Sequence, residues 1–170
     1  MANTYTLISS VTVGAGGASS IDFTSIPSTY TDLLLYVSAR NSVSNDGMGL
    51  KFNSSTTGYS YRDLYGTGST AGSSNNTTAP ITAYGLINPS TYTASVFGNA
   101  IVYIPNYATS NYKSVSIDGV AENNATATGM YLSASLWSNT AAITSINLTA
   151  LSSGTIQQYS TAYLYGIKSS

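Results

Sequence analysis

Few side chains in this chain could do chemistry. The sequence has 170 residues, with 5 Lys and Arg, 6 Asp and Glu, and no His or Cys. Without His or Cys there is no serine or cysteine triad of the usual kind, no Cys/His zinc site and no imidazole that titrates near neutral pH. The composition therefore favours a binding or structural protein over an enzyme. We expect no catalytic residue, no cofactor and no metal.

The acids are the remaining candidates for catalysis. A glycosidase needs two carboxyl groups that face each other across a sugar. If Asp118 and Glu122 share one strand, they lie about 13 Å apart at roughly 3.3 Å per residue, too far for a retaining or an inverting pair. A pair from two different strands stays open, but a glycan-degrading enzyme is the least favoured hypothesis. The other acids, whose spacing pairs none of them, are Asp22, Asp32, Asp46 and Asp63.

Charge and hydropathy also exclude two classes of partner. The formal net charge is -1 and the basic residues are scattered, so the chain cannot neutralise a run of phosphates and we expect no nucleic acid. Residues 1–10 lack the basic and apolar regions of a signal peptide, so we expect no export by that route. The strongly apolar run at 33–37 is far too short to span a bilayer, and we expect no membrane partner.

Tyrosine is the most informative residue type. The chain has 15 Tyr against 3 Phe, and Tyr combines a large apolar ring with a hydroxyl that tolerates water. A stripe of Tyr on the last predicted strand has three interpretations: half-buried core, a protein interface, or a platform on which sugars stack. The sole Trp belongs either to the core or to a subunit interface. The residues that we expect at a partner interface are Tyr5, Leu7, Trp137, Tyr159, Tyr163 and Tyr165.

Alternation of apolar and polar residues with a period of two predicts strands throughout the chain. The first strand has Tyr5, Leu7 and Val11 on one face and ends at the glycines of residues 14–17. No long window has the spacing of a helix. The other strands are predicted at 21–26, 30–40, Met48–Phe52, 59–65, 81–87, 94–104, 112–121, Gly129–Trp137, 143–151 and 159–167.

About ten or eleven short strands separated by turns predict an all-β fold, an antiparallel β-sandwich of jelly-roll type. The length favours a single domain over residues 1–170. Residues 45–47, Asn-Asp-Gly, predict a hairpin turn between the strands on either side. Residues 66–80 are almost wholly Gly, Ser, Thr, Asn and Ala, which predicts a long exposed loop.

Blocks along nearly the whole chain resemble a group of small structural proteins of tailed bacteriophages. The first blocks are residues 4–8, 14–18 and 23–33, the last of which reads Phe-Thr-Ser-Ile-Pro-Ser-Thr-Tyr-Thr-Asp-Leu. None of the blocks is a catalytic motif. The later blocks are residues 97–100, 103–107, 111–115, 136–144 and 159–167.

This resemblance implies a virion component, located on the capsid exterior in preference to the tail. The expected function is that of a capsid decoration or cement protein, which binds the major capsid protein and stabilises the shell. A homo-oligomer is expected, with a trimer favoured because trimers are common among such jelly-roll proteins. The alternative is a tail or head fibre component that binds a receptor or a host surface glycan, with the loop at 66–78 as the recognition surface.

Overall fold

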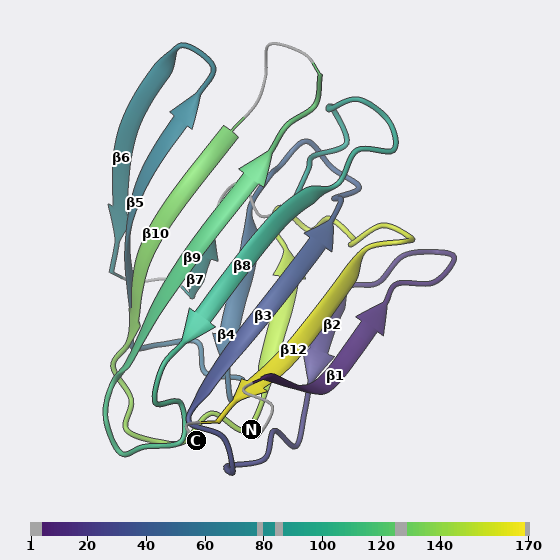
Figure 1. Ribbon diagram of the computed structural model, residues 1–170. Coiled ribbons are helices and arrows are strands. Elements are labelled where there is room, and N and C mark those ends of the chain that lie inside the picture. Colours follow the sequence, from purple (N-terminus) through teal and green to yellow (C-terminus); the bar gives the residue numbers. More distant parts are fainter. Residues whose placement is uncertain (1–4, 78–79, 84–86, 125–128, 169–170) are drawn as a thin grey trace.

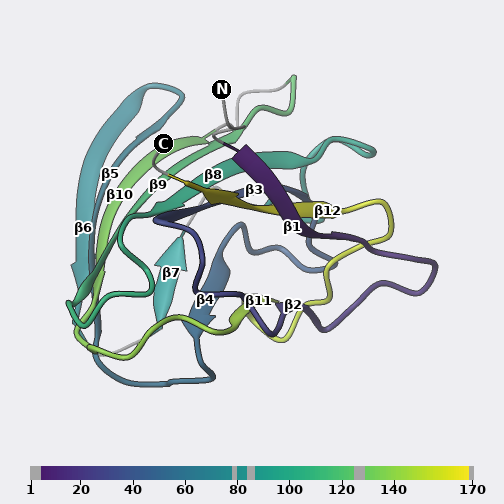
Figure 2. The ribbon, with the colours of Figure 1, turned by 60° about the horizontal axis from the view of Figure 1, so that its bottom comes forward.

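The chain folds into two antiparallel β-sheets. The computed structural model describes residues 5–77, 80–83, 87–124 and 129–168, and these form twelve strands (Figure 1). The large sheet has the order β1-β12-β3-β8-β9-β10-β5-β6, and the small sheet has the order β2-β11-β4-β7. The small sheet lies against the concave side of the large one (Figure 2). The predicted all-β, antiparallel sandwich is therefore confirmed.

The strands of the two sheets are as follows. The large sheet contains β1 (Tyr5–Thr12), β12 (Thr161–Ile167), β3 (Asp32–Ala39), β8 (Gly98–Ile104), β9 (Lys113–Ala121), β10 (Gly129–Trp137), β5 (Tyr59–Thr67) and β6 (Thr70–Asn76). The small sheet contains β2 (Ser20–Phe23), β11 (Ile146–Ala150), β4 (Met48–Phe52) and β7 (Ile81–Ala83).

The strand order is that of a jelly roll with two insertions. Four strands of the large sheet, β1-β12-β3-β8, face the small sheet, β2-β11-β4-β7. Together they have the connectivity of the two Greek keys of a jelly roll. The antiparallel pair β5-β6 follows β4 in the chain, and the pair β9-β10 follows β8. Both pairs extend the large sheet beyond β8. The large sheet is consequently wider than the small sheet that covers it.

Alternation determines which side chains enter the core. Along β9, buried and exposed residues alternate at every position from Lys113 to Ala121. Across four neighbouring strands, the register aligns Leu164, Leu35, Val102 and Ile117 in one row. All four are at most 2% exposed. The face of the large sheet that carries this row therefore forms one wall of the hydrophobic core.

Left-handed residues account for the strands that are shorter than predicted. Met48–Phe52 and Gly129–Trp137 have their predicted bounds. The strand predicted at 94–104 begins only at Gly98, and the one predicted at 159–167 begins at Thr161. Ser95 and Tyr159 have φ of 65° and 70°, which is incompatible with an extended strand. The strand predicted at 81–87 is described only in part, as β7.

The hairpin predicted at residues 45–47 is wrong, although a turn is present. The strands on either side, β3 and β4, belong to different sheets and do not pair. Asn45 Oδ1 accepts a hydrogen bond from the backbone N of Gly47 at 2.8 Å, which is the usual side-chain turn of an Asn. The residues at this point therefore help the chain to cross between sheets, a role that local sequence does not distinguish from a hairpin.

The long exposed loop predicted at residues 66–80 is also wrong. Strand β5 continues to Thr67, a two-residue turn at Gly68 and Ser69 follows, and β6 pairs back antiparallel from Thr70. Gly68 has a φ of 63°, as the first position of a type II′ hairpin turn requires. Gly72 of β6 lies under the ring of Tyr65, where an added Cβ would come within 2.5 Å of the hydroxyl. Small polar residues here build a strand because they pair with β5.

A buried arginine fastens the segment before β8 to the sandwich. Arg40 is 6% exposed. Its Nη1 donates to the carbonyl oxygens of Thr93 and Val96, both at 2.9 Å. Its Nη2 donates to the carbonyls of Tyr92 at 2.9 Å and Ser90 at 3.2 Å. Because its stem leaves the end of β3, the guanidinium fixes this segment to the large sheet.

Replacing Arg40 by Met removes these donors and leaves the four carbonyls without their partner. We expect the free energy of unfolding to fall by about 2 kcal/mol, since partly buried acceptors that lose a charged donor are costly. Urea unfolding followed by fluorescence measures this change. Arg62→Met is the control, because Arg62 is exposed, and we expect a change within about 0.5 kcal/mol. Equal losses for the two variants would contradict the role given to Arg40.

Candidate functional site

The outer face of the large sheet, which points away from the small sheet, is the main candidate site. Paired residues on neighbouring strands share a face, so the register identifies the members of this face. It carries all of the large exposed hydrophobic side chains of the described residues except Tyr112 and Tyr159. Their concentration on one face is unlike the scattered single residues of an ordinary surface.

The middle row of the outer face crosses six of the eight strands of the large sheet. From β12 to β5 it consists of large apolar side chains with one acid. At its far end, Leu132 is 57% exposed and Leu64 is 63% exposed, whereas Tyr36 and Tyr163 are 40% and 38% exposed. The row in order is Tyr163, Tyr36, Ile101, Asp118, Leu132 and Leu64.

Two flanking rows widen the apolar surface. On one side, Met130 and Val120 are directly paired and are 63% and 40% exposed. On the other side, Tyr165 packs edge-on against Tyr36 of the middle row, with ring centroids 5.9 Å apart. The half of the face over β1, β12, β3 and β8 is thus mainly aromatic, and the half over β9, β10 and β5 is mainly aliphatic. The row that contains Tyr165 is Leu7, Tyr165, Leu34, Tyr103, Ser116, Ala134 and Arg62.

Charge is scarce on the outer face. Among the strand residues that the register assigns to it, Asp32, Arg62 and Asp118 are the only acidic or basic side chains. Asp32 accepts hydrogen bonds from the Tyr103 hydroxyl and the backbone N of Asn106, both at 2.9 Å. Covering a surface with so few charges requires little desolvation. The face therefore suits close contact with another protein.

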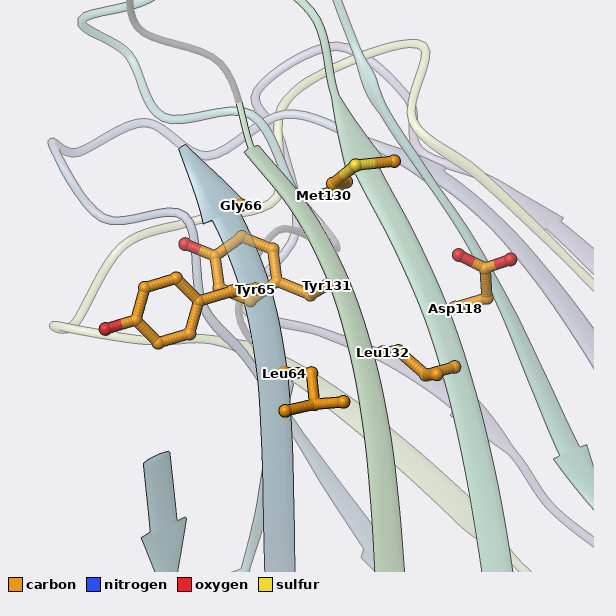
Figure 3. Close-up of a pocket in the computed structure, with 7 residues that line it drawn as sticks. All are labelled: Leu64, Tyr65, Gly66, Asp118, Met130, Tyr131 and Leu132. Atoms are coloured by element: carbon orange, nitrogen blue, oxygen red, sulfur yellow. The ribbon is translucent and has the colours of Figure 1, made fainter. Parts of the chain in front are cut away.

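The aliphatic half of the outer face is hollowed. Leu64, Asp118, Met130 and Leu132 line a hollow of about 350 Å³, and Figure 3 shows these side chains over three neighbouring strands. An adjoining hollow of about 550 Å³ extends to β6 and includes Ser73. The hollows are shallow and continuous along the sheet, which suits an inserted side chain of a partner protein better than an enclosed small molecule.

A second cluster lies at the start of β10. The rings of Tyr65 and Tyr131 stack with centroids 5.7 Å apart, on the other side of the strands from Leu132 (Figure 3). The Tyr131 hydroxyl donates to Asp46 Oδ2 at 3.5 Å. Burial raises the pKa of Asp46 above its ordinary value of 3.8. Burial, followed by the nearby charge of Asp46, raises the pKa of Tyr131 to about 12.

The raised pKa of Asp46 has a consequence for stability. The folded protein holds this proton more tightly than the unfolded chain, so the resulting stability is complete below pH 3.8 and is lost as the pH rises through the raised pKa. We therefore expect wild type to lose stability relative to Asp46→Asn as the pH rises from about 3 to about 7. Urea unfolding of both proteins at several pH values tests this. A parallel pH dependence for the two would contradict it.

The structure brings together four of the six residues predicted at a partner interface. Tyr5, Leu7, Tyr163 and Tyr165 lie on the aromatic half of the outer face. Tyr159 is 70% exposed but precedes β12 and lies outside the sheet. Trp137 is 1% exposed and stacks on Tyr59 in the core. Trp137 is therefore unavailable to a partner in the folded chain.

The carboxylates have separate local partners. Asp22 accepts from Asn147 Nδ2 at 2.6 Å, and Glu122 Oε1 accepts from the backbone N of Asn124 at 2.7 Å. Asp63 is 2% exposed and accepts from the hydroxyls of Ser133 at 2.5 Å and Ser74 at 3.0 Å. Among the described residues, no group of three Asp or Glu side chains is arranged to hold a metal ion.

Sequence reasoning missed the aliphatic half of the outer face. A period of two places Met130, Leu132 and Leu136 on one face of β10, but the pattern alone does not reveal that this face points outward. The inner face of β10 carries Ser133, Ser135 and Trp137 instead. Alternation by itself favours burial of the face that carries Met130, Leu132, Ala134 and Leu136, so the strand's own sequence held no signal that this face points outward.

The fold class is thus a jelly-roll β-sandwich with an apolar outer face on its larger sheet. Comparison of the chain with protein-family models, curated proteins and solved structures gives no match. Within the described ranges, no helix is long and apolar enough to cross a membrane.

Proposed function

We propose that the chain is a non-enzymatic structural protein of a tailed-phage virion. In this proposal it decorates the outside of the capsid, binds the major capsid protein and stabilises the shell. The observation that carries the proposal is the apolar, nearly uncharged outer face of the large sheet. Such a face favours binding to a protein surface over catalysis or binding of nucleic acid. The virion setting rests on the resemblance described above.

The size of the outer face is sufficient for a specific protein interface. Strands lie about 4.8 Å apart and rise about 3.3 Å per residue. Eight strands of about seven residues therefore present a surface of roughly 900 Å². A stable interface of standard size buries about 800 Å² on each partner. The outer face can supply this area without a contribution from the loops.

Stabilisation of the shell would come from many copies acting together. If each copy contacts neighbouring capsid subunits, the contacts must fail together before the subunits separate. Many contacts of modest affinity would then together resist the pressure inside the capsid. A homo-oligomer would increase this effect by joining several contacts in one particle.

The second candidate function is binding of a receptor or a host surface glycan by a tail or head fibre. The observation that favours it is the hairpin β5-β6, whose exposed strand β6 presents Thr, Ser and Asn side chains beside the hollows of the outer face. Such side chains supply many weak hydrogen bonds to sugar hydroxyls. Retention of the chain on a host glycan array, lost when Tyr side chains are removed, would favour this function.

Location and copy number separate the two candidates. Labelled antibodies on intact virions, together with quantified gel bands relative to the major capsid protein, measure both. Hundreds of copies spread over the head are expected for a decoration protein. A few copies confined to the tail would overturn capsid decoration and leave receptor binding.

A substitution on the outer face tests the binding surface itself. Leu132→Lys places a charge in the aliphatic half of the outer face, where the side chain is 57% exposed. We expect stability to change by less than about 1 kcal/mol. Binding to capsid shells that lack this protein should weaken at least about tenfold, since a charge in an apolar contact must be desolvated.

Tyr112→Lys is the matched control for Leu132→Lys. Tyr112 is a large hydrophobic residue that is 60% exposed but lies before β9 and outside the outer face. We expect this variant to bind shells as wild type does. Equal binding by Leu132→Lys and wild type in a co-sedimentation assay would exclude this half of the face as the capsid contact.

A further inference from the structure

Strand β6 differs from the other three strands at the sheet edges. Edge strands expose unpaired backbone groups, and proteins usually blunt them by shortness, bulges, charges or Pro. The edge strand β2 has four residues, and the described part of β7 has three. The pairing of β1 with β12 shifts register between Leu7 and Ser9. Strand β6 has seven residues in an unbroken register with β5, with no charge and no Pro.

The register identifies the backbone groups that β6 leaves open. The residues that flank a two-residue hairpin turn, Thr67 and Thr70, form a hydrogen-bonded pair, and such pairs then alternate along the strands. Ala71, Ser73 and Asn75 therefore occupy the intervening positions and direct their N–H and C=O groups away from β5. Within the part of the chain that the structure describes, no strand pairs with this side of β6.

The side chains of β6 permit close approach of another strand. All seven are small or uncharged, and the strand is exposed or half-buried along its length. Ser73 and Asn75 lie on the outer face, at the rim of the hollow next to Leu64. A strand that pairs with β6 would therefore continue the outer face as well as the backbone ladder.

We propose that β6 is a docking edge for a second copy of this chain. The two β6 strands pair antiparallel about a two-fold axis at Ser73. Ser73 then faces Ser73 of the partner subunit, and Ala71 faces Asn75 of the partner subunit. Each of these residue pairs exchanges two backbone hydrogen bonds, and the two large sheets become one continuous sheet.

The composition of β6 favours a second copy over an unrelated strand. Two-fold pairing brings identical residues together, so any charge near the axis would meet its own copy and repel it. The absence of charge along β6 removes this penalty. Pairing also joins the two outer faces edge to edge, so that two copies present a single apolar surface. The inference is independent of the virion setting, because the edge is complete in the isolated chain.

Three substitutions at Ser73 test the docking edge in the full-length chain. Ser73→Pro removes the outward N–H but leaves the ladder to β5 intact, and Pro is tolerated on an edge strand in this position. Ser73→Lys and Ser73→Glu each place like charges opposite each other at the axis. Ser73→Ala, which keeps the N–H, is the matched control. Thermal unfolding verifies that each variant is folded.

Sedimentation velocity over a range of concentrations measures self-association. We expect wild type and Ser73→Ala to form dimers with similar dissociation constants, and the Pro, Lys and Glu variants to raise the constant at least about tenfold. An equimolar mixture of the Lys and Glu variants should restore the dimer, because opposite charges then meet at the axis.

A wild-type chain that stays monomeric up to about 1 mM, or a Ser73→Pro variant that dimerises as Ser73→Ala does, would overturn the proposal. Neither result depends on capsids or on Leu132. Either one would therefore leave the proposed binding function of the outer face unaffected. Conversely, loss of shell binding by Leu132→Lys with an intact dimer would separate the two surfaces.

Discussion

The packing of a small sheet on a larger one is the constraint on which the rest of this structure depends. The inner row of Leu164, Leu35, Val102 and Ile117 is buried because the small sheet covers it. Nothing in the described chain covers the opposite face of the same strands. A strand that alternates between its two faces must place half of its side chains there. The nature of those outward side chains therefore determines what this face can bind.

Those outward side chains are apolar and aromatic where solvated sheets usually carry charge. Leu64, Met130 and Leu132 are each more than half exposed, and removing water from them favours contact by about 25 cal/mol per Å². The low charge of the whole chain, with only 6% charged residues, has the same effect because few ions need desolvation. Both features are costly for an isolated soluble domain and favourable for one that functions in an assembly. They support the proposed role as a structural subunit.

The inserted pairs β5-β6 and β9-β10 enlarge this outer face. They widen the large sheet beyond the region that the small sheet covers, and they supply the aliphatic half of the outer face. In the polar inner row at this end, Asp63 accepts hydrogen bonds from Ser133 and Ser74 of the neighbouring strands. Strand β6 is left as a regular, uncharged edge.

Much of the fold could be predicted from local alternation, and much of the site could not. Periodicity located β4 and β10 to the residue. It failed for β6, whose Ala, Gly and Asn residues have low strand propensity and become a strand only by pairing with β5. The predicted interface tyrosines of β12 do share a face, since a period of two fixes the face within a strand. Which face is outward depends on pairing across residues far apart in the sequence, so Leu132 and the buried position of Trp137 were beyond local reasoning.

Oxidative footprinting of methionine in isolated chain and in assembled particles tests most directly whether the outer face is covered by protein in its functional setting. Met130 is 63% exposed on that face and Met48 is fully buried. Met130 therefore reports on the outer face, and Met48 is the internal reference. A covered face predicts that Met130 oxidises at least several-fold more slowly in particles than in the isolated chain, while Met48 is slow in both. Equal oxidation of Met130 in the two samples would contradict a binding role for the outer face.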